Sequence, residues 1–169
     1  TLINERNLPV NLSNYRMVFI GDENLLNRNS PNLNNYPLII VNNHDGNDLG
    51  LTDRDGVSQL GSTSPLNVMK DSQKIRVYTR AFKKGRVAIS YYFLDEDNKA
   101  DGLIRVAATQ EISSRRKFGD VISYANPGTV LQNGRIQRER LCFYGIVESN
   151  YWTPAARSLF EDCVGFVAG

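Results

Sequence analysis

Short apolar runs that end at turn residues dominate the first part of this chain. Residues 16–20 are followed by Gly21 and Asp22, and residues 36–41 are followed by the polar stretch 42–46. Uninterrupted apolar runs of this length, bounded by turn residues, are typical of strands buried on both faces. The connection between them, residues 24–35, is long enough for one short helix. The pattern therefore predicts two parallel strands joined by a crossover, a βαβ unit.

The middle of the chain has a different pattern. Residues 42–64 are rich in Gly, Asn, Asp, Ser and Thr, which predicts a long loop. Beyond it, β-rich runs alternate with polar turns, and part of this region is expected to be antiparallel. The polar stretch 95–102 is expected to form the tip of a hairpin between two of these runs. The expected strands lie at residues 75–79, 86–94, 103–109, 120–124 and 141–147.

The last segment carries the clearest helical pattern. Thr153 can cap the helix and Pro154 suits its first position. Apolar residues then recur at helical spacing, so the helix is expected to pack one face on the sheet. These residues are Ala155, Leu159, Phe160, Cys163, Val164 and Val167.

Length and composition are those of one ordinary globular domain. The chain has 169 residues, of which 41% are hydrophobic and 22% are charged. The longest apolar runs are far shorter than the roughly 20 residues of a membrane span. A net charge of +2, from 20 basic and 18 acidic residues, lacks the positive excess of a dedicated nucleic-acid binder. The glycine-rich phosphate loops of dinucleotide and P-loop proteins are missing from the sequence, so we expect no cofactor.

The two cysteines, Cys142 and Cys163, permit one disulfide or two thiols. Free cysteines are among the most frequently buried residues, which favours two buried thiols. Cys142 stands inside an apolar run and Cys163 on the apolar face of the expected helix. A packing role is therefore expected for both, because a thiol in apolar surroundings is unreactive.

Several stretches carry a family resemblance. They are residues 11–20 (NLSNYRMVFI), 47–52 (NDLGLT), 140–145 (RLCFYG) and 151–164 (YWTPAARSLFEDCV). The chain resembles a divergent class I glutamine-amidotransferase-like domain of the kind found in large surface or secreted proteins. The resemblance implies an α/β fold: a flavodoxin-like three-layer sandwich with a mostly parallel central sheet, an antiparallel β-rich insertion and a C-terminal helix packed on the sheet.

Two features of that family are missing from this sequence. The family begins with a strand and helix that would precede Thr1, so residues 1–169 are expected to be a single α/β domain cut from a longer chain. The family's nucleophilic cysteine stands on a tight elbow between a strand and a helix, with a histidine to activate it. Neither Cys142 nor Cys163 has such a setting, and the only histidine is His44. The resemblance therefore implies a domain without the catalytic pair.

A few polar and aromatic residues could still bind a ligand. His44, Asp45 and Asp48 follow an expected parallel strand, where open α/β sheets place ligand-binding groups. Trp152, with Tyr151, could stack on a sugar, although aromatic residues before a helix often serve as packing anchors. Calcium is a further alternative to plain solvated turns, because it favours clustered carboxylate oxygens. The candidate ligands are Asp53, Asp55, Asp95, Asp97 and Asp101.

Basic residues form three clusters, which could contact an anionic surface or a polysaccharide or could simply be solvated. They are residues 83–86, residues 115–117, and the group Arg135, Arg138 and Arg140.

The sequence thus favours a non-catalytic structural or interaction domain of a cell-surface, secreted or virion assembly, with an extracellular location. Its partners are expected to be the parent chain or identical subunits. The alternative is a carbohydrate-binding or degenerate hydrolase-like domain.

Overall fold

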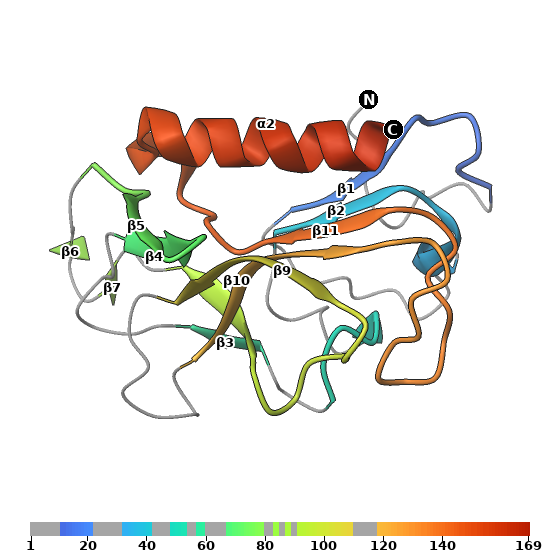
Figure 1. The fold of residues 1–169 in the computed structure, drawn as a ribbon. Helices are drawn as coiled ribbons and strands as arrows, with labels where there is room; N and C mark the ends of the chain where they lie inside the picture. The colour runs from blue at the N-terminus through green and yellow to red at the C-terminus, as the bar shows by residue number, and fades with distance from the viewer. Residues whose placement is uncertain are drawn as a thin grey trace.

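The computed structural model describes residues 11–21, 32–41, 48–53, 57–59, 67–79, 83–84, 87–88, 91–109 and 118–169. Within these ranges most strands join one nine-stranded mixed sheet, and a two-stranded ribbon stands beside it (Figure 1). The ribbon consists of β6 (Lys83–Lys84) and β7 (Val87–Ala88).

The parallel part of the sheet consists of three strands. They are β1 (Val18–Ile20), β2 (Leu38–Ile40) and β11 (Leu141–Tyr144), with β2 in the middle. Every residue of β2 and β11 is buried, as their uninterrupted apolar sequences predict. The parallel pairing expected for the first two apolar runs is confirmed. A short 3₁₀ helix, η2 (Leu33–Asn35), precedes β2.

The rest of the sheet is antiparallel and is organised around β10 (Gly119–Ala125). β10 pairs with β11 and β8 along one side and with β9 along the other. Asp120, for example, is paired with Leu94 of β8 on one side and with Ala108 of β9 on the other. β4 and β5 form a hairpin beyond β9, and β3 pairs with β8. The remaining bounds are β3 (Val57–Gln59), β4 (Asn67–Lys70), β5 (Gln73–Arg76), β8 (Tyr92–Asp95) and β9 (Ile104–Thr109).

Glycine is required where β8 crosses the ends of β10 and β11. A Cβ added at Gly145 would lie 2.0 Å from the carbonyl oxygen of Tyr92, and one added at Gly119 would lie 1.8 Å from that of Leu94. The amide of Tyr92 in turn donates to the carbonyl of Gly145. A side chain at either glycine would therefore push β8 away from the sheet.

One face of the sheet is covered by the long helix α2 (Pro154–Ala168), which lies across β1, β2 and β11 (Figure 1). The Thr153 side chain accepts a hydrogen bond from the Ala156 amide, so the expected N-cap and the helix after it are confirmed. A turn, η4 (Ser149–Tyr151), leads from β11 toward the helix. Buried residues of α2, β2, β10 and β11 form one hydrophobic core on this face.

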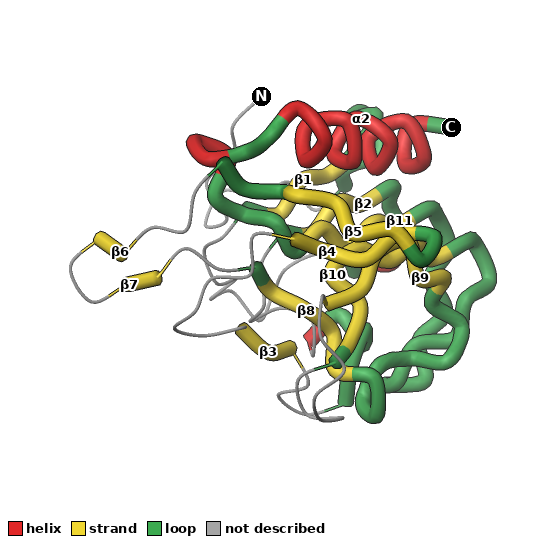
Figure 2. Tube along the Cα trace, turned by 60° about the vertical axis from the view of Figure 1, so that its left-hand side comes forward, coloured by secondary structure: helices red, strands yellow, loops and turns green. Residues whose placement is uncertain are grey.

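The opposite face is covered by loops and short turns (Figure 2). A second hydrophobic core lies here, in which side chains of β2 and β11 meet leucines of the loop segments. These leucines are Leu12, Leu33, Leu49, Leu51, Leu103 and Leu131.

The expected flavodoxin-like three-layer sandwich is therefore wrong. Such a fold needs a mostly parallel sheet with helices on both faces. Here three strands are parallel, antiparallel pairs make up the rest of the sheet, and the described α2 covers one face. The resemblance at residues 140–145 and 151–164 covers one strand and one helix, and such a unit packs equally well on a mixed sheet.

Two local expectations are also wrong. The stretch 95–102 does not close a hairpin, because β8 and β9 pair with opposite sides of β10 rather than with each other. The long loop 42–64 is interrupted by β3, which pairs with β8. The sequence pattern did not predict β3, because its three residues, VSQ, contain no apolar run.

Candidate functional site

A cluster of four charged side chains lies where β8, β9 and β10 meet. Its centre is Asp120 of β10, whose side chain is 0% exposed. One carboxylate oxygen, Oδ2, accepts a hydrogen bond from Lys99 Nζ at 2.8 Å and another from Ser123 Oγ at 2.7 Å. The other, Oδ1, accepts from Arg105 Nε. A buried carboxylate with several donors on its two oxygens is well compensated for its lost hydration.

Glu96 completes the cluster from the turn after β8. Its Oε2 accepts from the guanidinium of Arg105 and lies 3.3 Å from Lys99 Nζ. The Arg105 guanidinium also lies 4.9 Å from the centre of the Phe118 ring. Two acids thus face two bases, so the formal charges in the cluster cancel. We refer to Glu96, Lys99, Arg105 and Asp120 as the ionic cluster.

Local backbone structure brings the ionic cluster together. The amides of Asn98 and Lys99 both donate to the carbonyl of Asp95, which folds residues 95–99 into a tight turn. Irregular pairing with β9 between Asp120 and Ser123 brings these two side chains onto one side of β10. Arg105 is paired directly with Ser123, so its side chain lies on that side too.

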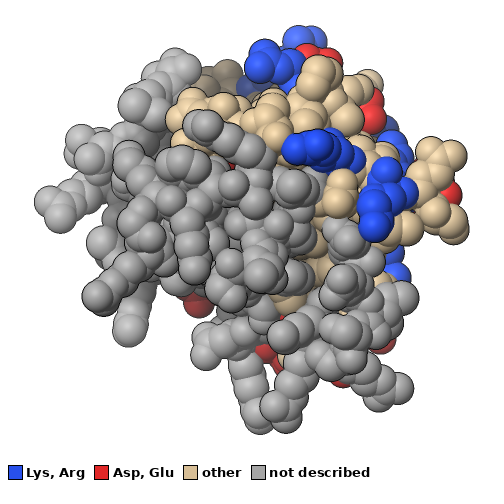
Figure 3. Space-filling model, turned by 90° about the vertical axis from the view of Figure 1, so that its left-hand side faces the viewer, with Lys and Arg blue, Asp and Glu red and all other residues tan. Residues whose placement is uncertain are grey.

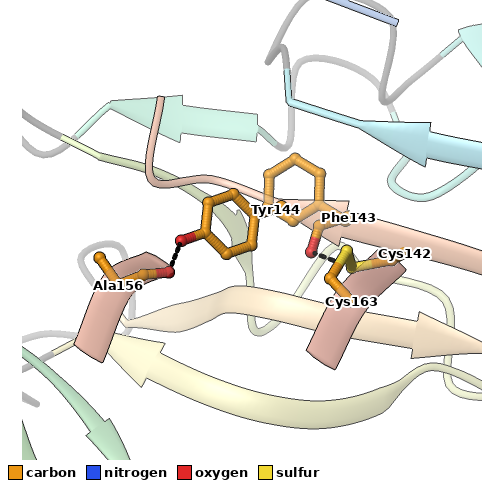
Figure 4. The surroundings of a disulfide bond; sticks show 5 residues. All are labelled: Cys142, Phe143, Tyr144, Ala156 and Cys163. Carbon is orange, nitrogen blue, oxygen red and sulfur yellow. Dashed lines mark hydrogen bonds between the residues drawn. A yellow bond between two sulfur atoms is a disulfide. The ribbon is translucent and has the colours of Figure 1, made fainter. Parts of the chain in front are cut away.

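An aromatic cluster lies under the start of α2. The Trp152 indole N–H donates to the carbonyl of Ile146, and its ring packs on Tyr144 and Phe160. The Tyr144 hydroxyl donates to the Ala156 carbonyl at 2.6 Å (Figure 4). Trp152 is therefore packed against the neighbouring aromatic rings, as expected of an anchor before a helix, and its stacking on a sugar stays a prediction.

Burial raises the pKa values of three tyrosines near α2. The pKa of the Tyr144 hydroxyl is raised far above its usual value because burial disfavours the phenolate. Burial likewise raises the pKa of Tyr78, and the nearby charge of Glu148 adds to the effect. The pKa of Tyr124 is raised by burial and by the charge of Asp162. All three hydroxyls therefore stay protonated at neutral pH.

The two cysteines form a disulfide, so the expectation of two buried thiols is wrong. Cys142 of β11 is bonded to Cys163 of α2, and both residues are fully buried (Figure 4). The sequence placed each residue on an apolar face, but only the packing of α2 on β11 brings the two sulfurs together. The bond fixes the helix to a central strand. Neither sulfur is a thiolate, so neither is a nucleophile in this form.

The edge strand β1 has an exposed aromatic residue. Phe19 is 53% exposed, and its ring contacts Phe160 of α2 at 6.2 Å between ring centres in an edge-to-face arrangement. Within the described ranges, β1 is hydrogen-bonded to β2 alone. The side of β1 away from β2 is therefore an edge of the described sheet.

The structure places the predicted ligand-binding residues only in part. His44 and Asp45 lie outside the described residues, and Asp48 is exposed next to the buried Leu49. Their joint role as a ligand site stays a prediction, as does the carbohydrate-binding alternative.

The structure describes four of the five predicted calcium ligands, and calcium binding at them stays a prediction. Asp53, Asp97 and Asp101 are exposed, Asp95 is half-buried at the end of β8, and Asp55 lies outside the described residues. Across the ranges that the structure describes, no group of three or more His, Cys, Asp or Glu side chains is arranged to hold a metal ion. The carboxylates that do gather, Glu96 and Asp120, are paired with Lys99 and Arg105 instead.

The structure describes the side chains of one of the three predicted basic clusters. Arg135 and Arg138 are exposed, whereas Arg140 donates to the Phe166 carbonyl and lies over the Phe166 ring. Residues 115–117 lie outside the described residues, and only the backbone of 83–84 is described. Figure 3 shows the Lys and Arg side chains of one face as separate groups, some with acidic atoms beside them. A contact with an anionic surface or polysaccharide stays a prediction.

Sequence reasoning missed the ionic cluster. The signal was available in Asp120, which is a charged residue in the otherwise apolar strand run 120–124. A charge at an inward position of a strand needs a partner of opposite sign. Its pairing with Arg105 could not be read off, because it depends on the register of β9 against β10.

Comparisons with protein-family models, with curated proteins and with solved structures gave no match. The resemblance to the glutamine-amidotransferase-like family thus stays a prediction. No helix within the described residues is long and apolar enough to cross a membrane.

Proposed function

We propose that this chain is a non-catalytic interaction domain of a cell-surface, secreted or virion assembly, and that it pairs with an identical subunit along the edge strand β1. The observation that carries the proposal is the side of β1 that no other described strand pairs with, where Phe19 is 53% exposed. An exposed aromatic residue on an edge strand favours aggregation in a protein that stays monomeric, and it suits a protein whose sheet is extended by a partner strand.

The backbone of β1 supports strand addition. The Val18 amide donates to the Pro37 carbonyl, and the Ile20 carbonyl accepts from the Val41 amide. Because successive residues of a strand direct their polar groups to opposite sides, the amide and carbonyl of Phe19 point away from β2. A partner strand can therefore bond to Phe19 without disturbing the pairing of β1 with β2.

An identical subunit suits this edge for reasons of symmetry. Two copies of β1 related by a two-fold axis would pair antiparallel and bring the two Phe19 rings close together at the centre of the contact. The same apolar residue then serves both sides, and the two sheets become one continuous sheet.

The disulfide supports an extracellular location. Disulfides persist in oxidising compartments such as the cell exterior and are rare in reducing ones. The Cys142–Cys163 bond is compatible with a secreted or surface-exposed protein. The same bond supports a non-catalytic role, because it uses both sulfur atoms that could have acted as nucleophiles.

Light scattering of the purified chain over a range of concentrations tests the proposal. We expect the mass to rise from one subunit to two as concentration increases. Phe19→Asp should keep the chain monomeric, because the charge would be buried at the contact. Val130→Asp is the matched control, since Val130 is 60% exposed and lies away from β1 in the loop between β10 and β11. Trp152 fluorescence checks that both variants are folded.

A wild-type chain that stays monomeric at every concentration would overturn the proposal. Equal loss of association in Phe19→Asp and Val130→Asp would also contradict it, because the contact would then not lie at β1.

A further inference from the structure

The ionic cluster contains the groups needed to form an amide between two side chains. We propose that Lys99 and Asp120 condense into an intramolecular isopeptide bond, which joins the turn before β9 to strand β10. The two groups are already in contact, with Lys99 Nζ 2.8 Å from Asp120 Oδ2. Holding two reactants in contact replaces an encounter in solution, and effective concentrations of about 10⁵–10⁸ M are reached in well-oriented cases.

The atoms of the reaction balance within the chain. The Nζ of Lys99 bonds to the Cγ of Asp120, and the bond between Cγ and Oδ2 breaks. Of the three ammonium protons, one stays on the amide nitrogen and two leave with Oδ2 as water. The positive and negative charges disappear together, so the step requires neither an oxidant nor an activating cofactor.

Three neighbouring side chains are placed to assist the proton transfer and to stabilise the charge that develops during the reaction. Glu96 Oε2, at 3.3 Å from Lys99 Nζ, can take a proton from the ammonium group and make it nucleophilic. Arg105 Nε donates to Oδ1, where negative charge develops as the amine adds to the carboxyl carbon. The Ser123 hydroxyl donates to Oδ2, the oxygen that leaves.

Burial favours the product over the ion pair. Asp120 is 0% exposed and Lys99 is 13% exposed, so both charges are held largely away from water. Keeping charges in such a place has a desolvation cost that an uncharged amide avoids. Arg105 and Glu96 still neutralise each other after the reaction. A covalent link at this position would hold β9 and β10 together under stress, which suits a domain of an extracellular assembly.

The intact mass of the full chain, reduced and denatured, tests the proposal directly. We expect a mass lower than that of the sequence by one water molecule. Proteolytic mapping should recover Lys99 and Asp120 in one branched peptide. Lys99→Arg keeps the charge but should restore the full mass. Lys70→Arg is the matched control, because Lys70 pairs with Asp162 at the surface at 3.9 Å, and it should keep the loss of water.

Glu96→Gln tests the proton transfer, because it keeps both reacting groups. We expect freshly folded Glu96→Gln to lose water much more slowly than the wild type, or not at all. Loss of water at the wild-type rate would overturn the role of Glu96.

Another reaction that loses water must be separated from this one. Asp–Gly sequences such as Asp101-Gly102 can form a succinimide, which also lowers the mass by one water. A succinimide would persist in Lys99→Arg and would map to the Asp–Gly peptide. That outcome, or a folded wild-type chain that keeps its full mass after prolonged incubation, would overturn the proposal.

Discussion

Breaking the bond between Cys142 and Cys163 should cost a large part of the stability of this fold. The bond joins β11 to α2 and closes a segment with a sequence separation of 21. In the chain-entropy treatment a loop of that size restricts the unfolded chain by about 3 kcal/mol. This is a substantial fraction of the roughly 5–15 kcal/mol by which a typical domain is stable. We therefore expect reduction to lower the free energy of unfolding by about 3 kcal/mol.

Urea unfolding followed by the fluorescence of Trp152 provides the assay. Trp152 is the single tryptophan and packs beside the start of α2, so its emission reports the loss of helix packing. The wild type is measured with and without a reductant, and Cys142→Ala/Cys163→Ala serves as the control. Because both cysteines are buried, reduction should proceed through opening of the fold and should be slow without denaturant.

The reductant should destabilise the wild type and leave the double variant unchanged. Two titratable thiols in the denatured, unreduced wild type would show that the bond is not formed. If the bond is present but its reduction leaves the unfolding midpoint unchanged, the entropic reasoning is wrong.

Three further perturbations test separate parts of the structure. Asp120→Ala should destabilise the fold by about 1.5–3 kcal/mol in urea unfolding, because Lys99, Arg105 and Ser123 lose the buried carboxylate that accepts their hydrogen bonds; Asp162→Ala, at an exposed pair, should change it by less than about 1 kcal/mol. The raised pKa of Tyr144 stabilises the fold fully below its unfolded-state pKa of about 10, and this stability is lost as the pH rises above that value. Stability measured against pH should therefore fall less steeply above about pH 10 in Tyr144→Phe than in the wild type; an equal slope would contradict the assignment. Gly145→Ala should lower the thermal midpoint sharply because its Cβ would overlap the Tyr92 carbonyl, whereas Gly165→Ala, in open space on α2, should raise it slightly.

The C-terminal helix and the apolar strands could be predicted, because their sequence signals lie within a few residues of one another. The helix after Thr153 depends on a capping side chain, a proline at the first turn and apolar spacing, and all of these lie within a few residues of one another. The strands β1, β2 and β11 follow from short apolar runs in the same way, although β1 is not buried on both faces as expected, because Phe19 is exposed. The parallel pairing of β1 with β2 could also be predicted from the sequence, because the connection between the two strands is long enough for a crossover.

The fold class could not be predicted from the sequence, because it depends on which strands pair with one another. The antiparallel strands around β10 have the same alternating patterns whether they form an insertion or the main sheet. Residues 140–145 and 151–164 form one strand and the start of one helix, and these two elements do not determine how the other strands pair. The second face of the sheet is covered by leucines from loops that carry little periodic signal.

The sequence by itself determined that the chain would form buried strands and end in a capped amphipathic helix. These properties depend on residue types and on spacing within one element. Only the tertiary structure decided that Cys142 meets Cys163, that Asp120 lies among Lys99, Arg105 and Glu96, and that β1 stands at an edge with Phe19 exposed. Each of these brings together residues from different elements, and their contact depends on register and packing, which local patterns do not encode.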